Sequence, residues 1–266
     1  MNAQAQEITT GLASQGGHWY AQDGSPAYEI KAKAGHMRAV TLRDARKLNL
    51  YPSVTGILNC AAKPQLERWK IEQAMMACIT LPRAEWENET EFMARALEDS
   101  QQQANKARER GTILHAQCEQ SFIDYRSVEP EHLEYVAPVR QWLDVRFGGI
   151  QWQAEKSFAS ALGYGGKVDL HSREAGGVVL DFKTKAFDDP LKVKGYDEQG
   201  IQLAAYAQGL NLGPDALRVN LFISTTVPGL IVPVEWPTAT FGRHWSMFQA
   251  LLSYWQADKG YTPSCP

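Results

Sequence analysis

Hydrophobic and polar positions alternate most clearly in the second half of the chain, where they predict a β-hairpin. Strand-type residues at 164–171 and 178–183 are separated by a glycine-containing turn centred near Ala175. With that centre, an antiparallel register places Asp169 directly opposite Asp181. Side chains alternate along a strand, so two sets are expected on opposite faces: a polar set of Lys167, Asp169, Asp181 and Lys183, and an apolar set of Val168, Leu170, Leu180 and Phe182.

Apolar residues at helical spacing precede this hairpin, and a mixture of strand and helix patterns follows it. Helices are predicted over residues 54–61, 64–79, 84–126, 131–147, 197–210 and 240–256. Further strands are predicted over residues 151–157, 217–224 and 229–235. The order of helices, a three-stranded meander, a helix, two strands and a helix is typical of an α/β (α+β) fold with a central mixed β-sheet flanked by helices.

Two of these helices carry specific core predictions. The helix over residues 64–79 is expected to bury four apolar residues, Leu66, Trp69, Ile71 and Met75. The helix over residues 84–126 has room for one break near Gly111, and its second half is expected to bury Ile113, Leu114, Phe122 and Ile123.

The pattern also predicts how the chain divides. Residues 1–50 are interpreted as a small N-terminal module, with a polar tail, a hairpin of residues 19–20 and 28–30 around Asp23-Gly24, and a short helix capped by Thr41. Residues 51–266 are interpreted as the main domain, with a helical part (51–148) and a core that contains the predicted sheet (149–260). The start of the chain lacks signal-peptide features and no long apolar run is present, so we expect a cytoplasmic protein without a membrane span.

Charge and cysteine content limit the classes of function. The net charge of −3 over 266 residues argues against a protein that simply coats nucleic acid, but it allows an enzyme that acts on one. Basic residues are concentrated locally at 106–110 and 183–194. The four cysteines, Cys60, Cys78, Cys118 and Cys265, are scattered without a C-x-x-C pair, which argues against a disulfide framework and a zinc site.

The hairpin brings together candidates for metal-assisted chemistry. Asp181 and Lys183 are two residues apart on one strand, so they share a face, and Asp169 is expected opposite them. Two facing carboxylates repel each other, and a divalent cation with oxygen ligands would relieve that repulsion. The lysine could orient a water molecule and stabilise charge on an attacked phosphate. Taken alone, the D-x-K pair also fits a solvated strand face.

Four further polar residues are candidates on weaker grounds. Glu155 lies on the preceding strand and could be a third acidic ligand or an ordinary polar strand residue. His115 follows Gly111 by one helical turn, so a ligand and a structural histidine are both open interpretations. Gln202 and Tyr206, also one turn apart, could face the site or form the edge of an amphipathic helix.

Together these residues resemble a known superfamily. The string Gly111-x-x-x-His115, Glu155, Gly166-x-x-Asp169, Asp181-x-Lys183 and Gln202-x-x-x-Tyr206 is similar to the PD-(D/E)XK nuclease superfamily, and more closely to its RecB-type exonuclease branch. The upstream stretches PSVTGIL and KPQLERWK resemble the start of phage-type exonucleases and of the mitochondrial genome maintenance exonuclease. The resemblance therefore covers residues from about 51 to 206, and it implies a restriction-endonuclease-like core.

The resemblance implies a role for each matched residue. His115, Asp169 and Asp181 would bind Mg²⁺ or Mn²⁺ together with the backbone carbonyl of Phe182, and Glu155 would bind it directly or through water. Lys183 would position the attacking water, and Gln202 and Tyr206 would hold the lysine and the nucleic-acid backbone. Some relatives carry an iron–sulfur cluster on four cysteines, three of them grouped after the core. Because Cys265 alone follows the core here, we expect no iron–sulfur cluster.

The expected function is a divalent-metal-dependent DNA exonuclease of phage-type recombination, repair or replication. Its expected partners are DNA ends or single strands and, in addition, a single-strand annealing or recombination protein. Two alternatives stay open: a DNA-binding recombination factor with a dispensable nuclease site, and an endonuclease or RNase of the same superfamily.

Overall fold

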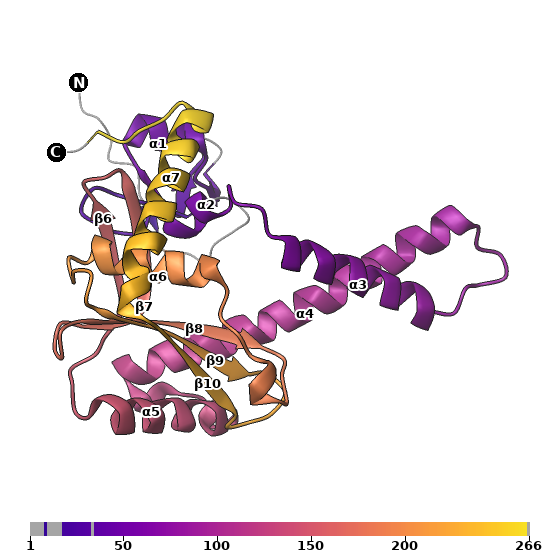
Figure 1. Ribbon diagram of the computed structural model, residues 1–266. Helices are drawn as coiled ribbons and strands as arrows, with labels where there is room; N and C mark the ends of the chain where they lie inside the picture. The colour runs from indigo at the N-terminus through magenta and orange to yellow at the C-terminus, as the bar shows by residue number, and fades with distance from the viewer. Residues whose placement is uncertain (1–7, 10–17, 33–34, 265–266) are drawn as a thin grey trace.

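A computed structural model describes residues 8–9, 18–32 and 35–264 of the chain (Figure 1). The helices are α1 (Leu42–Leu48), α2 (Val54–Leu58), α3 (Pro64–Thr80), α4 (Glu89–Ile123), α5 (Leu133–Phe147), α6 (Asp197–Gly209) and α7 (Phe241–Lys259). The strands are β1 (Ile8–Thr9), β2 (Trp19–Tyr20), β3 (Glu29–Lys31), β4 (Met37–Ala39), β5 (Tyr51–Pro52), β6 (Gln153–Ser160), β7 (Tyr164–Ser172), β8 (Val178–Lys185), β9 (Leu217–Ser224) and β10 (Ile231–Trp236). Short 3₁₀ turns occupy Tyr125–Ser127, Pro130–His132, Pro190–Lys192 and Thr238–Thr240.

A five-stranded mixed sheet lies at the centre, in the order β10-β9-β8-β7-β6. Strands β8 and β9 are parallel and the other neighbours are antiparallel. Parallel neighbours need a crossover connection, and α6 supplies it between β8 and β9. The predicted α/β fold with a mixed sheet flanked by helices is confirmed.

Helices cover both faces of this sheet (Figure 1). On one face, residues of α6 and α7 such as Leu203 and Phe248 form a buried cluster with Val179 of β8. On the other face, apolar residues of α4 and α5 form a second cluster with Leu180 and Phe182 of the same strand. Strand β8 is therefore buried on both sides, which gives its polar residues a desolvated environment.

The central hairpin has the predicted register but not the predicted faces. Leu170 pairs with Leu180, as expected for a turn centred near Ala175. Val168, however, lies in the cluster of α6 and α7, opposite to Leu170, so the prediction of one shared apolar face was wrong for Val168. The physical reason is that regular pairing is interrupted at Asp169, between these two residues. The β7–β8 ladder ends at the Leu170–Leu180 pair, and on the other side Glu155, with a φ of 53°, is left unpaired between the Ala154–Leu170 and Lys156–Val168 pairs.

The N-terminal strands pair differently from the prediction. The expected hairpin of residues 19–20 and 28–30 was wrong, because β2 pairs with β5 and β3 pairs with β1 and β4. The segment around Asp23 forms a tighter local turn instead: Tyr20 bridges Pro26, the N–H of Ala27 donates to the carbonyl of Trp19, and the N–H of Ala21 donates to that of Ser25. The predicted capping box of Thr41 and Asp44 is confirmed at the start of α1. The rest of the predicted polar tail, residues 1–7 and 10–17, lies outside the described residues.

Residues before 51 pack into the main core. Trp19, Ile30 and Ala45 belong to the same buried cluster as Tyr164 of β7 and Leu203 of α6. The division of the chain at residue 50 stays a prediction, but the N-terminal residues share one core with the sheet.

Helix α3 and the first half of α4 form an arm that projects away from the body (Figure 1). The four residues expected to be buried on α3 are instead exposed: Leu66, Trp69, Ile71 and Met75. The reason is that small side chains, including Ala77 of α3 and Ala96 of α4, occupy the buried positions of the arm. Ile113 and Ile123 of α4 are exposed as well, while the predicted burial of Leu114 is confirmed. Within the described part of the chain, no helix is both long and apolar enough to cross a membrane.

Helix α4 is continuous through Gly111, so the break that the sequence allowed near this residue does not occur. A Cβ at this position would lie 2.6 Å from Oγ1 of Thr184 on β8. Gly111 therefore allows α4 to pack closely against the strand that carries Asp181 and Lys183, one turn before His115.

This packing predicts that the effect of Gly111→Ala on the free energy of unfolding changes sign when Thr184 is also replaced. Gly111→Ala should destabilise the protein by about 1 kcal/mol, because overpacking costs roughly 1–3 kcal/mol and outweighs a gain of about 1 kcal/mol in helix propensity. In a Thr184→Ala background the same substitution should stabilise the protein, because the hydroxyl is gone. Urea unfolding of the four proteins measures both values, and destabilisation in both backgrounds would contradict the packing argument.

Candidate active site

The candidate residues come from five elements of the fold. Helix α4 carries His115, β6 carries Glu155, β7 carries Asp169, β8 carries Asp181 and Lys183, and α6 carries Gln202 and Tyr206. All of them except Glu155 are joined to Asp169 or Asp181 by a short chain of hydrogen bonds or ion pairs.

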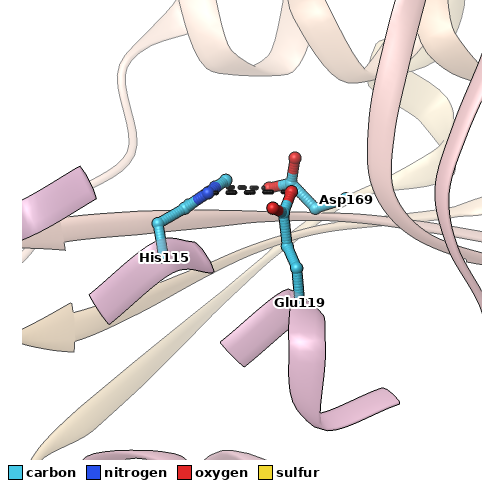
Figure 2. Close-up of side chains that lie close together, drawn as sticks. All are labelled: His115, Glu119 and Asp169. Atoms are coloured by element: carbon cyan, nitrogen blue, oxygen red, sulfur yellow. Dashed lines mark hydrogen bonds and ion pairs between the residues drawn. The ribbon is translucent and has the colours of Figure 1, made fainter. Parts of the chain in front are cut away.

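Asp169 lies where β7 and β8 separate. The ladder between these strands ends at the Leu170–Leu180 pair, one position before Asp169 would face Asp181. In place of a carbonyl on β7, Oδ2 of Asp169 accepts a hydrogen bond from the backbone N–H of Phe182 at 2.7 Å. The same oxygen lies 2.9 Å from Nε2 of His115. The end of the ladder therefore lets a side chain from α4 reach the carboxylate (Figure 2).

Asp181 is 3 % exposed and is surrounded by hydrogen-bond donors. Its Oδ2 lies 2.7 Å from Nζ of Lys183 and accepts a hydrogen bond of 2.7 Å from Nδ2 of Asn220. Its Oδ1 accepts a hydrogen bond from Nε2 of Gln202 at 3.1 Å. These donors compensate the cost of burying a carboxylate. The Lys183 side chain is 28 % exposed, so solvent or a substrate can reach it.

Gln202 links the lysine to the tyrosine. Its Oε1 accepts a hydrogen bond from Lys183 at 3.2 Å, while its Nε2 donates to both Asp181 and the hydroxyl of Tyr206. An amide oxygen accepts and an amide nitrogen donates, so this set of partners fixes the orientation of the side chain. Gly166 of β7 allows the ring of Tyr206 to pack directly against the strand, because a Cβ at this position would lie 2.9 Å from that ring.

Glu155 is near the site but is directed to another partner. Its Oε1 lies 2.6 Å from Nζ of Lys167, and its positive φ is uncommon for a residue other than glycine. Such backbone conformations are concentrated at functional sites, because the surrounding structure must hold them in place. Two groups of described residues have ligand atoms close enough for one ion. One is Glu129, Glu131 and His132, away from this site, and the other contains His115 and Asp169 but not Glu155 or Asp181.

The third member of the group with His115 and Asp169 is Glu119, which the sequence left ambiguous, one turn after His115, and which was not among the predicted site residues. One ligand atom from each of His115, Glu119 and Asp169 lies within 4.8 Å of the others (Figure 2). The Glu119 side chain is buried, and its Oε1 has no hydrogen-bond partner among the described residues. The i, i+4 spacing from His115 on α4 was the available signal, but that spacing is common on any helix. Asn220 was also missed, and a single asparagine in a strand gives no comparable signal.

Burial and neighbouring charges shift the pKa values of these groups. Burial alone lowers the pKa of His115, but the charge of Asp169 and the hydrogen bond to it raise the pKa to about 9. Burial raises the pKa of Glu119 to about 8. Burial would raise the pKa of Asp169, but His115 holds it below its ordinary value. Burial raises the pKa of Asp181 despite the charge of Lys183, and Asp181 in turn raises the pKa of Lys183.

These shifts predict that the metal-free protein loses stability as the pH rises. Glu119 and His115 both bind their protons more tightly in the folded protein than in the unfolded one. The stability from Glu119 is present below its ordinary pKa of about 4.5 and is lost as the pH rises through about 8, and that from His115 is lost between about 6.5 and 9. The urea midpoint in EDTA should therefore fall between pH 6 and pH 9. Glu119→Gln should flatten the lower part of this curve, and an unchanged curve would contradict the assigned shifts.

The donor set fits a divalent cation. Imidazole nitrogen and carboxylate oxygen are both ligands that Mn²⁺ accepts, and carboxylates suit Mg²⁺. Nε2 of His115 and Oδ2 of Asp169 are hydrogen-bonded to each other at 2.9 Å, and a cation held by both would replace this hydrogen bond. Glu119 offers a further ligand, because its buried Oε1 has no hydrogen bond among the described residues and lies 3.7 Å from Nδ1 of His115.

The three cysteines that the structure describes are not among the candidate ligands of this site. Cys60, Cys78 and Cys118 are free thiols on or near the helices before the sheet. Cys265, on which the expected absence of an iron–sulfur cluster depends, lies outside the described residues.

Comparisons with known proteins add little to this geometry. No family model matches the chain, and no curated protein matches its sequence. Among solved structures, the chain is similar to one described as "Crystal structure of SSO0001", with 14% sequence identity and a TM-score of 0.27. That match covers 70% of this chain and 86% of the other. A TM-score this low carries no argument about fold or function.

Proposed function

We propose that this protein is a divalent-metal-dependent DNA exonuclease of the PD-(D/E)XK superfamily, in its RecB-type branch. The observation that carries the proposal is the placement of His115 and Asp169 beside the Asp181–Lys183 pair, at the point where β7 and β8 separate. This arrangement combines ligands for a hard cation with a solvent-accessible amine, which is what hydrolysis of a phosphodiester requires.

Each residue has a role in this proposal. Mg²⁺ or Mn²⁺ held by His115, Asp169 and Asp181, with Glu119 or Glu155 as a further acidic group, would lower the pKa of a bound water and neutralise charge on the scissile phosphate. Lys183 positions the attacking water and stabilises the charge that develops on the phosphate.

The helix α6 residues act through the lysine and the backbone of the substrate. Gln202 holds Nζ of Lys183 toward the site through its oxygen, and Tyr206 fixes the amide from the other side. The site then presents the partly exposed amine of Lys183 beside the buried carboxylates of Asp169 and Asp181. The substrate is DNA with a free end or a single-stranded segment. A single-strand annealing or recombination protein is a further proposed partner.

Digestion of defined DNA substrates tests the proposal. End-labelled single-stranded and linear duplex DNA should be shortened from their ends in Mg²⁺ or Mn²⁺, and EDTA should stop the reaction. Closed circular DNA and RNA should remain intact, and Asp181→Ala should be inactive on every substrate. Cleavage of closed circular DNA would show that the protein is an endonuclease, and cleavage of RNA would show that it is an RNase; either result would overturn the proposal. Tight DNA binding without cleavage in either metal would favour a recombination factor with a dispensable nuclease site.

A further inference from the structure

Asn220 is a fully buried amide beside the Asp181 carboxylate. It lies on β9 directly across the parallel ladder from Asp181, and both side chains point to the same face of the sheet. Its Nδ2 donates a hydrogen bond of 2.7 Å to Oδ2 of Asp181. A buried polar group in a strand that is otherwise apolar is costly unless its hydrogen bonds are satisfied, so this contact requires an explanation.

Trp236, on the edge strand β10, fixes the orientation of that amide. Its indole Nε1–H donates a hydrogen bond of 2.8 Å to Oδ1 of Asn220. The indole nitrogen can only donate, so the amide oxygen must face it and the NH₂ group must face Asp181. If the amide were reversed, its NH₂ group would face the N–H of Trp236, donor against donor, and its oxygen would face the Asp181 carboxylate, acceptor against acceptor.

The indole ring is itself held in place. It packs edge-on against His244 with ring centroids 5.1 Å apart, and a Cβ at Gly195 would lie 2.9 Å from its Cζ2. The absence of a side chain at Gly195 therefore admits the ring. The result is a line of fixed groups that runs from Trp236 through Asn220 to Asp181.

From these contacts we infer that Asn220, oriented by Trp236, is a positioning residue that holds Asp181 in the geometry for cation binding. The inference rests on the proposed function. Oδ2 of Asp181 has two donors, Lys183 and Asn220, and they differ in freedom. Lys183 has a flexible chain that must turn toward water and phosphate during the reaction. The hydrogen bond from Trp236 to its oxygen fixes the Asn220 amide. The Asp181 carboxylate therefore keeps its orientation through the hydrogen bond from Asn220 when Lys183 moves away from Oδ2.

Three variants test the inference: Asn220→Leu, Trp236→Phe and, as the matched control, Trp142→Phe, whose ring packs against Phe147 in the other cluster. Mn²⁺ binding is measured by titration calorimetry, the melting temperature by thermal unfolding in EDTA, and cleavage on end-labelled DNA. Loss of a group that orients a metal ligand lowers metal affinity by about 10–100-fold. Asn220→Leu should weaken Mn²⁺ binding by that factor, and Trp236→Phe should weaken it at least several-fold.

The control separates positioning from general loss of stability. Trp142→Phe should bind Mn²⁺ like the wild type, and its melting temperature gives the effect of truncating a packed indole ring alone. If Asn220→Leu does not fold, Trp236→Phe decides the question, since it keeps an aromatic ring and removes the N–H. Wild-type Mn²⁺ affinity in Trp236→Phe would overturn the inference while leaving the proposed function in place. A wild-type protein that neither binds Mn²⁺ nor cuts DNA would overturn both.

Discussion

Replacing Lys183 with alanine is expected to lower the rate of DNA cleavage by about 10²–10³-fold, the usual effect of removing one donor that stabilises a developing charge. The fold should survive, because Asp181 keeps its hydrogen bonds from Asn220 and Gln202. Initial rates on end-labelled DNA, with the melting temperature measured in parallel, give both quantities.

Lys185→Ala is the matched control for this variant. Lys185 lies two residues further along β8 and is exposed, so its removal changes the net charge by the same amount without touching Asp181. Its cleavage rate should stay within about twofold of the wild type, as surface charges act weakly. Equal losses in Lys183→Ala and Lys185→Ala would show that general attraction of DNA, and not water positioning, is what the lysine supplies.

Asp169→Asn is expected to abolish Mn²⁺ binding and cleavage while keeping the protein folded. One oxygen of Asp169 accepts both the Phe182 N–H and the His115 contact. The amide oxygen of asparagine can take the same place, so the hydrogen bonds persist while the charge that attracts the cation is lost. Titration calorimetry with Mn²⁺ and the DNA assay measure the two losses.

Asp169→Leu separates the structural role of this carboxylate from its charge. It leaves the Phe182 N–H without an acceptor in a buried position, which should cost a further 1–3 kcal/mol or so in the free energy of unfolding. Asp188→Asn, in the loop after β8, is the control for loss of one negative charge and should resemble the wild type. Retained Mn²⁺ affinity in Asp169→Asn would remove Asp169 from the set of ligands.

Local chemistry made the central hairpin predictable from sequence. The glycines of the turn fix its centre, the centre fixes the register, and the register brings Asp169 and Asp181 to the same level of the sheet. The helical spacing of Gly111 and His115 similarly predicted that both lie on one face of their helix, and the structure shows that Gly111 on this face packs against Thr184 of β8.

The features that were missed depend on contacts between distant segments. Trp19 pairs with Pro52, and its local partner across the turn is Ala27 in place of the expected residues 28–30; no local pattern announces the pair with Pro52. Regular pairing is interrupted at Asp169, and Val168 lies on the other face of the sheet from Leu170, which binary alternation cannot anticipate. Asn220 lies within an ordinary strand pattern, and its partnership with Asp181 exists only because α6 returns the chain parallel to β8. On α3, apolar periodicity predicted burial, but the small side chains of the arm left the large ones exposed.

The location of one Mn²⁺ ion tests the central claim most directly. Crystals grown with Mn²⁺ and measured near the manganese absorption edge should show an anomalous peak about 2.1–2.3 Å from Nε2 of His115 and from a carboxylate oxygen of Asp169. The peak should disappear in Asp169→Asn. An intact hydrogen bond between His115 and Asp169 with no peak beside it, in a protein that still cuts DNA with Mn²⁺, would contradict this account of the site.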